Sequence, residues 1–210
     1  LPSCGFTSFV VAPSTRPVRS VGTLRTGPLS GENEFISIKI ASNGTVSLKD
    51  KKSGQEYSDL IMFEDVAETG DGWFHTASVN DLKCLSSACA AQVSAVNDGP
   101  KILSFRITVD MKVPARFDFA SERRLEHDEN LRISSLVMLK KGARSLEVET
   151  TIDNNIEDHQ LKLLLPTDAV KATTYLAHHP FDFVERSIAL DAGTFDWQEM
   201  ERSEKPFLSI

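Results

Sequence analysis

The residues best suited to chemistry in this 210-residue chain lie in one acidic stretch, from Phe63 to Trp73. Its carboxylates are Glu64, Asp65, Glu68 and Asp71. Glycosidases place two carboxylates on either side of the bond they cleave, so this composition invites that chemistry. Carboxylates in a glycine-containing loop also simply stay solvated or form Asx turns, and sequence spacing does not fix their separation in space. The solvated interpretation is therefore the better one for these groups.

Trp73 follows Gly70-Asp71-Gly72 at the end of this stretch. An aromatic ring next to a glycine-rich loop is typical of a platform on which a sugar stacks. Tryptophan serves equally often as an ordinary packing anchor, because its large apolar face favours burial. Both interpretations of Trp73 remain open at this point.

A second cluster of reactive side chains comprises His178, His179, Asp182, Glu185 and Arg186. Adjacent residues of a strand point to opposite faces, so the two histidines would seldom reach one metal ion, and no i,i+2 or i,i+4 ligand spacing is present. We therefore predict no metal site here. A histidine with Glu185 could instead do acid–base work on a sugar, and Arg186 could hold a carboxylate or hydroxyl.

The remaining motifs point away from several enzyme classes. The chain has no glycine-rich phosphate loop, no serine in a nucleophile elbow and no Cys–His pattern. His159 follows a polar turn and is expected to cap or bridge it.

The elements that must position these residues are predicted to be strands. Apolar residues alternate on both sides of Asn43-Gly44, which predicts a hairpin from Phe35 to Leu48. Asn-Gly suits a tight turn because both residues tolerate positive φ. Further strand signals cover Lys101–Val113, Ile133–Leu139, Leu146–Ile152 and Leu161–Leu165, the last as a strand buried on both faces. Ala88 to Val96 suits either a helix or a strand. The sequence thus predicts an all-β fold, a large antiparallel β-sandwich with little helix.

Charge and composition exclude several partners. The formal net charge is -7 and the densest basic clusters are single pairs, such as Arg123-Arg124, expected at a solvated strand end. This balance argues against nucleic acid and anionic membranes as partners. No apolar run approaches the roughly 20 residues of a membrane helix. Three cysteines, Cys4, Cys84 and Cys89, give no disulfide framework, so we expect a reducing, cytoplasmic location.

Two regions are expected along the chain. Residues 1–30 are predicted to be an entering strand and a Pro/Ser/Arg-rich linker, and residues 31–210 the main β-domain. The chain begins with Leu1 rather than Met, from which we expect a piece of a longer polypeptide.

Several blocks, in order, resemble one family, the C-terminal β-domain of the glycoside hydrolase family 38 α-mannosidases. The blocks are Leu1-Pro2-Ser3-Cys4-Gly5-Phe6, Glu32-Asn33-Glu34, Asn43-Gly44-Thr45, Leu48-Lys49-Asp50-Lys51, Phe63-Glu64-Asp65, Gly70-Asp71-Gly72-Trp73, Leu146-Glu147-Val148, Asp153-Asn154, His159-Gln160-Leu161 and Phe181-Asp182-Phe183-Val184-Glu185-Arg186. They span nearly the whole chain. The bacterial members, including mannosylglycerate hydrolases, are the most similar type.

The resemblance implies a galactose-mutarotase-like supersandwich, here truncated at its C-terminus. It also implies a retaining zinc-dependent α-mannosidase whose zinc and nucleophile lie on an N-terminal catalytic domain with a His-x-Asp motif. None of the five histidines here begins a His-x-Asp motif, so we expect no catalytic residue, metal ligand or cofactor in this chain itself. The implied partners are that catalytic domain of the same polypeptide and an α-mannoside substrate; a homo-oligomer is left open.

The resemblance also supplies the candidate substrate-binding residues, Asp71, Trp73 and Arg186. Family members place an aromatic residue, usually tyrosine, beside the bound sugar just after the Gly-Asp pair, and Trp73 stands there. Tryptophan keeps the stacking face but lacks the phenolic hydroxyl. Two alternatives remain: a stand-alone carbohydrate-binding module, and a mutarotase-type sugar epimerase using His178 or His179 with Glu185.

Overall fold

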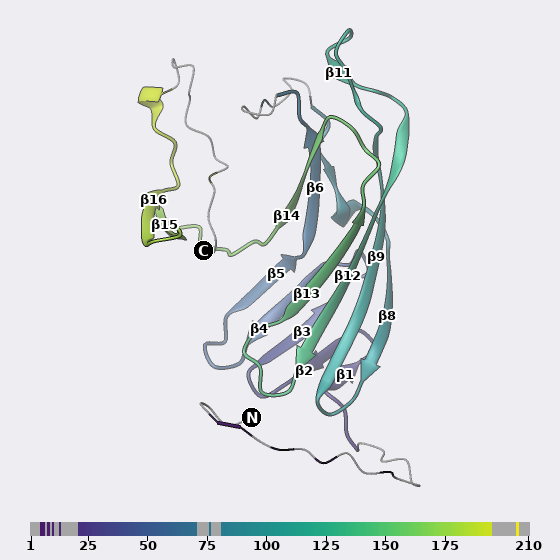
Figure 1. Cartoon of the computed structure of the whole chain (residues 1–210), viewed down its shortest axis with the longest axis vertical. Helices are drawn as coiled ribbons and strands as arrows, with labels where there is room; N and C mark the ends of the chain where they lie inside the picture. Colours follow the sequence, from purple (N-terminus) through teal and green to yellow (C-terminus); the bar gives the residue numbers. More distant parts are fainter. Residues whose placement is uncertain are drawn as a thin grey trace. The chain divides into compact units, whose positions relative to one another are not determined.

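The computed structural model describes residues 21–70, 76 and 81–194, together with isolated positions 5, 6, 8, 10, 13 and 205. The chain forms two compact units, Leu1–Pro166 and Thr167–Ile210, which are taken separately below. Figure 1 shows that the first unit is built of twisted antiparallel strands. The predicted all-β sandwich with little helix is confirmed. The boundary near residue 31 stays a prediction.

One layer of the first unit is a five-stranded sheet in sequential order. Its strands are β1 (Arg25–Gly27), β2 (Ser30–Glu32), β3 (Ile36–Ile40), β4 (Val46–Asp50) and β5 (Glu56–Leu60). Every connection joins neighbouring antiparallel strands, as short turns require.

The opposing layer is a four-stranded sheet in the order β13-β12-β9-β8. Its strands are β8 (Ala91–Asp98), β9 (Ile102–Pro114), β12 (Asp128–Lys140) and β13 (Glu147–Asp153). β9 and β12 match the two long strands expected from period-2 alternation. The ambiguous stretch from Ala88 to Val96 is mostly strand, because β8 pairs along the edge of β9.

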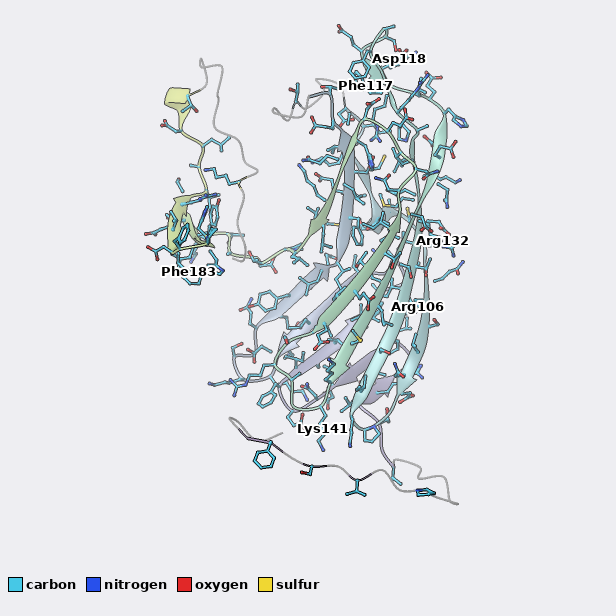
Figure 2. All side chains as sticks on the ribbon, viewed as in Figure 1. Arg106, Phe117, Asp118, Arg132, Lys141 and Phe183 are labelled. Carbon is cyan, nitrogen blue, oxygen red and sulfur yellow. The ribbon has the colours of Figure 1, made fainter. Side chains whose placement is uncertain are left out.

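Smaller sheets extend one end of this sandwich. β6 (Met62–Ala67) lies between β14 (His159–Leu164) and β7 (Cys84–Leu85), and the short 3₁₀ helix η1 (Ser86–Ala88) follows. β10 (Phe117–Asp118) and β11 (Arg123–Arg124) form a two-stranded hairpin between β9 and β12. In Figure 2, Phe117 and Asp118 stand at the end of the unit opposite Lys141, which lies in the β12–β13 turn.

One hydrophobic core joins the layers. Alternate residues of β3, β9 and β12 point inward and are buried: Ile36, Ile38, Ile40, Leu103, Phe105, Ile107, Val109, Met111, Val113, Leu131, Ile133, Val137 and Leu139. The two large sheets approach closely, since a Cβ on Gly31 would lie 2.1 Å from Leu103 Cδ2. Period-2 alternation in the sequence is thus the cause of the two-layer packing.

The β3–β4 hairpin is confirmed, but its turn differs from the expectation. The Ala41 N–H donates to Thr45 O (2.9 Å), which makes a three-residue loop, and Gly44 has φ +86°. Asn43 does not adopt positive φ; its Oδ1 accepts the Thr45 N–H as an Asx turn. Two features require glycine at position 44. The first is its positive φ, and the second is that a Cβ there would lie 2.8 Å from Ile107 Cγ2.

The expectation that Leu161–Leu165 is a strand buried on both faces is wrong, as the exposure of β14 shows. Among the described residues β14 pairs only with β6, so it lies at the edge of that sheet. Leu161 packs against the core, whereas Leu163 and Leu165 are 48% and 56% exposed. Continuous apolar character here reflects an uncovered edge rather than double burial.

Asn33 ties the start of β3 to the opposite layer. Its Nδ2 donates to Lys140 O and Ala143 O, both at 2.7 Å, while its Oδ1 accepts the N–H groups of Phe35 and Ile36. The residue is buried. The amide nitrogen thus bonds across the sandwich, and the amide oxygen fixes the local backbone that leads into β3.

We expect Asn33→Ala to lower the free energy of unfolding by about 2–3 kcal/mol, because it leaves several buried backbone groups without partners. Urea unfolding followed by tryptophan fluorescence measures this. The matched control is Asn130→Ala. Its half-buried side chain makes one 3.3 Å bond to the exposed Asp110, and the substitution should cost less than about 0.5 kcal/mol. Equal losses in the two variants would contradict the assignment.

The second unit contains the hairpin of β15 (Thr174–His178) and β16 (Phe183–Ser187), followed by the 3₁₀ helix η2 (Ala192–Thr194). Within the part of the chain that the structure describes, no helix is long and apolar enough to cross a membrane.

Candidate functional site

β6 leads directly into the acidic stretch singled out above. Its burial alternates, so Phe63, Asp65 and Ala67 point inward. Glu64 points to the other face and forms an ion pair with Lys83 at 3.1 Å. A strand, rather than a loop, therefore places Asp65 inside the protein.

Asp65 is fully buried and has two basic partners. Its Oδ1 lies 2.6 Å from Arg124 Nη2, and its Oδ2 contacts His159 Nδ1. The side chains of Arg124 and His159 are only 4% and 5% exposed. The expectations that Asp65 is solvated and that Arg124 sits at a solvated strand end are both wrong, because the inward positions of β6 and β11 bring the two charges together.

The other ring nitrogen of His159 meets a second acceptor. His159 Nε2 lies 3.1 Å from Asn154 Oδ1, which also accepts the Ile156 N–H at 3.1 Å. Both ring nitrogens of His159 therefore lie beside side-chain oxygen atoms. His159 bridges the turn, as expected, and also reaches the buried carboxylate.

Cys84 lies directly across the β6–β7 ladder from Asp65. Burial raises the pKa of its thiol, with the Asp65 charge adding to the shift and the Arg124 charge opposing it. Burial also raises the pKa of Cys89. Both groups are therefore free thiols with little thiolate character, which makes them poor nucleophiles.

Beyond Asp65, the end of β6 is held by two further contacts. The Ala67 N–H donates to Asp81 Oδ2 at 2.7 Å, and the Glu68 N–H donates to Asp158 O at 2.9 Å. Ala67 is also the register partner of His159. The segment that begins at Glu68 therefore leaves a strand end that is fixed on both sides.

Hydrogen bonds among Glu68, Thr69, Gly70 and Thr76 hold the residues that follow β6. Glu68 Oε1 accepts the N–H groups of Gly70 and Thr76 at 2.9 and 2.8 Å. The N–H and hydroxyl of Thr69 both donate to Thr76 O at 3.0 Å. Residues 69 and 76 are thus hydrogen-bonded to each other. Two of the candidate substrate-binding residues, Asp71 and Trp73, fall between them in the sequence and lie outside the described residues.

The third candidate, Arg186, lies on β16 in the second unit. Its Nη2 donates to His179 Nε2 at 2.6 Å. On the same hairpin, the His178 ring stacks on Phe183 with a centroid distance of 4.7 Å, and Glu185 Oε1 accepts the Thr174 hydroxyl. The structure therefore gathers the histidine cluster around one hairpin.

Potential metal ligands do not converge in the parts that are described. Among residues 21–70, 76, 81–194 and the isolated positions given above, no three His, Cys, Asp or Glu side chains are grouped as a metal ion requires. The Asp65 cluster contains one carboxylate and a histidine whose two nitrogens are already engaged, so it does not fit a metal either.

The buried cluster of Asp65, Arg124 and His159 is the feature that sequence reasoning missed. One signal was available: Phe63, Asp65 and Ala67 share the inward period of β6. A carboxylate at an inward position requires a buried cation, which would have directed attention to Arg124 and His159. Their distance along the chain hid the pairing.

Comparison with known families accounts for most of the chain. Residues 32–210 match the model of the "Glycosyl hydrolases family 38 C-terminal domain". A putative mannosylglycerate hydrolase from Halalkalibacterium halodurans is 28% identical over 169 residues, which covers 74% of this chain and 19% of that protein.

Two solved structures from Enterococcus faecalis share the fold. An α-mannosidase superposes with a TM-score of 0.78 at 26% identity, over 83% of this chain and 21% of that chain. A protein in glycosyl hydrolase family 38 superposes with a TM-score of 0.77 at 27% identity, over 81% of this chain and 22% of that chain. The chain therefore spans about a fifth of the length of these relatives. By the match over residues 32–210, it belongs to the glycosyl hydrolase family 38 C-terminal domain family.

Proposed function

We propose that this domain is the non-catalytic C-terminal part of a retaining α-mannosidase, where it braces the catalytic domain and lines the sugar site. The observation that carries the proposal is that the described residues on either side of Asp71 and Trp73 in the sequence are held together. Thr69 donates two hydrogen bonds to Thr76 O, and Glu68 Oε1 accepts the N–H groups of Gly70 and Thr76, at the end of a strand fixed by neighbouring segments. Fixed loop ends are what a substrate-positioning residue needs, because catalysis depends on sub-ångström placement.

Within that proposal, one domain carries out catalysis and this domain contributes to substrate binding. A zinc ion, the nucleophile and the acid/base would belong to the N-terminal catalytic domain of the same polypeptide, where the zinc would act as a Lewis acid. This domain would supply shape and an aromatic face, with Asp71 and Arg186 as further substrate contacts. An α-mannoside is the proposed substrate class, and the name of the Halalkalibacterium relative suggests mannosylglycerate.

A cytoplasmic location fits the same proposal. Burial keeps Cys84 and Cys89 as free thiols, which suits a reducing compartment.

Binding calorimetry with mannose and mannobiose tests the shared-site proposal against a stand-alone carbohydrate module. If the sugar site is completed by another domain, the 210-residue chain should give no measurable heat with either sugar at millimolar concentration. Binding by the isolated chain that disappears in Trp73→Ala would favour the module instead.

A further inference from the structure

The single Asn-Gly pair of the sequence, Asn43-Gly44, lies in the turn between β3 and β4. Asparagine loses ammonia most readily before glycine, because glycine has no side chain to hinder attack by its own backbone nitrogen. In that reaction the Gly44 nitrogen gives up its hydrogen and bonds to Asn43 Cγ, and the Nδ2 group leaves as ammonia. Water then opens the resulting succinimide at one of its two carbonyls, which leaves aspartate or isoaspartate at position 43.

The attacking nitrogen is engaged elsewhere in the folded chain. The Gly44 N–H donates to Ala41 O at 3.0 Å, which fixes the plane of the peptide that joins Asn43 to Gly44. Gly44 is buried, so water and hydroxide have little access to this N–H. Rotation of the peptide is opposed by close packing, since a Cβ on Gly44 would lie 2.8 Å from Ile107 Cγ2 and 2.9 Å from Ala91 Cβ. The nitrogen can therefore attack only after the turn opens.

The side chain of Asn43 is held as well. Its Oδ1 accepts the N–H and the hydroxyl of Thr45 at 3.2 and 3.0 Å, and its Nδ2 donates to Ser87 O at 3.2 Å. Donors on Oδ1 polarise the carbonyl, which by itself favours attack at Cγ. Loss of ammonia also needs a free Gly44 nitrogen and a free Nδ2, and the turn provides neither.

Hydrogen bonds also tie this turn to other segments. The Ala91 N–H, at the start of β8, donates to Ser42 O at 3.0 Å, and the Ala41 N–H donates to Thr45 O at 2.9 Å. The Ser87 carbonyl that holds Asn43 belongs to η1. Opening the turn therefore breaks bonds to β8 and η1 in addition to those within the hairpin.

We propose that Asn43 is a spontaneous deamidation site that the folded domain protects: the hydrogen bonds of the β3–β4 turn suppress the loss of ammonia until the turn opens. Isoaspartate formed in an open chain no longer fits the turn, because it adds a methylene group to the backbone where Gly44 packs closely against Ile107 and Ala91. The modified chain therefore refolds to a less stable protein, and isoaspartate at position 43 marks chains that have been unfolded.

The first test compares the folded and the unfolded protein. The purified chain is kept in mildly alkaline buffer with or without unfolding concentrations of urea, and peptide mass spectrometry follows deamidation at each asparagine. A synthetic peptide of residues 39–47, kept in both buffers, corrects for the effect of urea itself. Asn43 should be the first asparagine modified in urea, and its rate in the folded protein should be at least about 100-fold lower, because the turn must open first. Similar rates in the folded and unfolded protein would overturn the proposal.

Two variants test whether the turn itself gives the protection. Thr45→Val removes the hydroxyl that donates to Asn43 Oδ1 and should speed deamidation of the folded protein about fivefold, the effect of one lost hydrogen bond on opening. Asn33→Ala lowers stability before the start of β3, away from the turn, and should leave the rate within about twofold. No acceleration in Thr45→Val, or an equal acceleration in Asn33→Ala, would assign the protection to the fold as a whole and overturn the role of the turn.

Refolding tests the effect of isoaspartate. Protein that has been aged in urea is refolded, brought to the urea midpoint of the unmodified chain and given a brief pulse of protease, which digests unfolded molecules. Isoaspartate at position 43, detected by an isoaspartyl methyltransferase, should be about tenfold depleted in the chains that survive, because less stable molecules are unfolded at that midpoint. Equal isoaspartate content before and after the pulse would contradict its exclusion from the turn.

Discussion

Asp65→Ala is expected to lower the free energy of unfolding of this domain by about 3–5 kcal/mol, because it leaves the Arg124 guanidinium buried without a counter-charge and removes the side-chain partner of His159. All three side chains are at most 5% exposed, so water cannot replace the lost carboxylate without local opening. The loss is large against the roughly 5–15 kcal/mol that a domain has in total.

Urea unfolding at neutral pH measures this loss, with Asp110→Ala as the matched control. Asp110 is a carboxylate on the neighbouring sheet whose 3.8 Å ion pair with Arg132 is exposed, and its removal should cost less than about 1 kcal/mol. Similar midpoints for the two variants would mean that the Asp65 charge is not buried as the structure places it.

Trp73→Ala is expected to raise KM for an aryl α-mannoside about tenfold in the enzyme that joins this domain to its catalytic domain, which corresponds to about 1.4 kcal/mol. Under the proposed function, the substitution removes an apolar face against which a sugar ring would stack, a contact that would be present before and during the reaction. Uniform binding of this kind changes KM more than kcat.

Two conservative variants show whether the ring itself matters. Trp73→Phe keeps a smaller flat face and should lose less, and Trp73→Tyr adds a phenolic hydroxyl to such a face. Steady-state kinetics on the three variants give an order of KM values, alanine highest. A KM that is the same in Trp73→Ala and the unchanged enzyme would contradict a substrate contact at this position.

Alternation in the sequence was sufficient to predict the sandwich. The long strands β9 and β12 follow from apolar residues at every second position, and the β3–β4 hairpin from the turn at Asn43-Gly44. The predictions of burial that were wrong concern residues whose environment is set by segments far away in the chain. Leu163 is 48% exposed because β14 has β6 as its single strand neighbour in the part of the chain that the structure describes, and no local sequence pattern indicates that.

The candidate site was less predictable, for the same physical reason. Trp73 was named through resemblance, and the sequence alone left it open between stacking and packing. Asp65 was grouped with solvated carboxylates because its cations, Arg124 and His159, lie 59 and 94 residues away along the chain. A pairing of that kind becomes visible only when the sheets are assembled.

Hydrolysis of an aryl α-mannoside by the purified 210-residue chain is the sharpest test of the proposed division of labour between domains. We expect no turnover and no stoichiometric zinc, because the proposal gives catalysis to another domain and leaves support and an aromatic contact to this one. Turnover by this chain alone that is abolished by a chelator would contradict it.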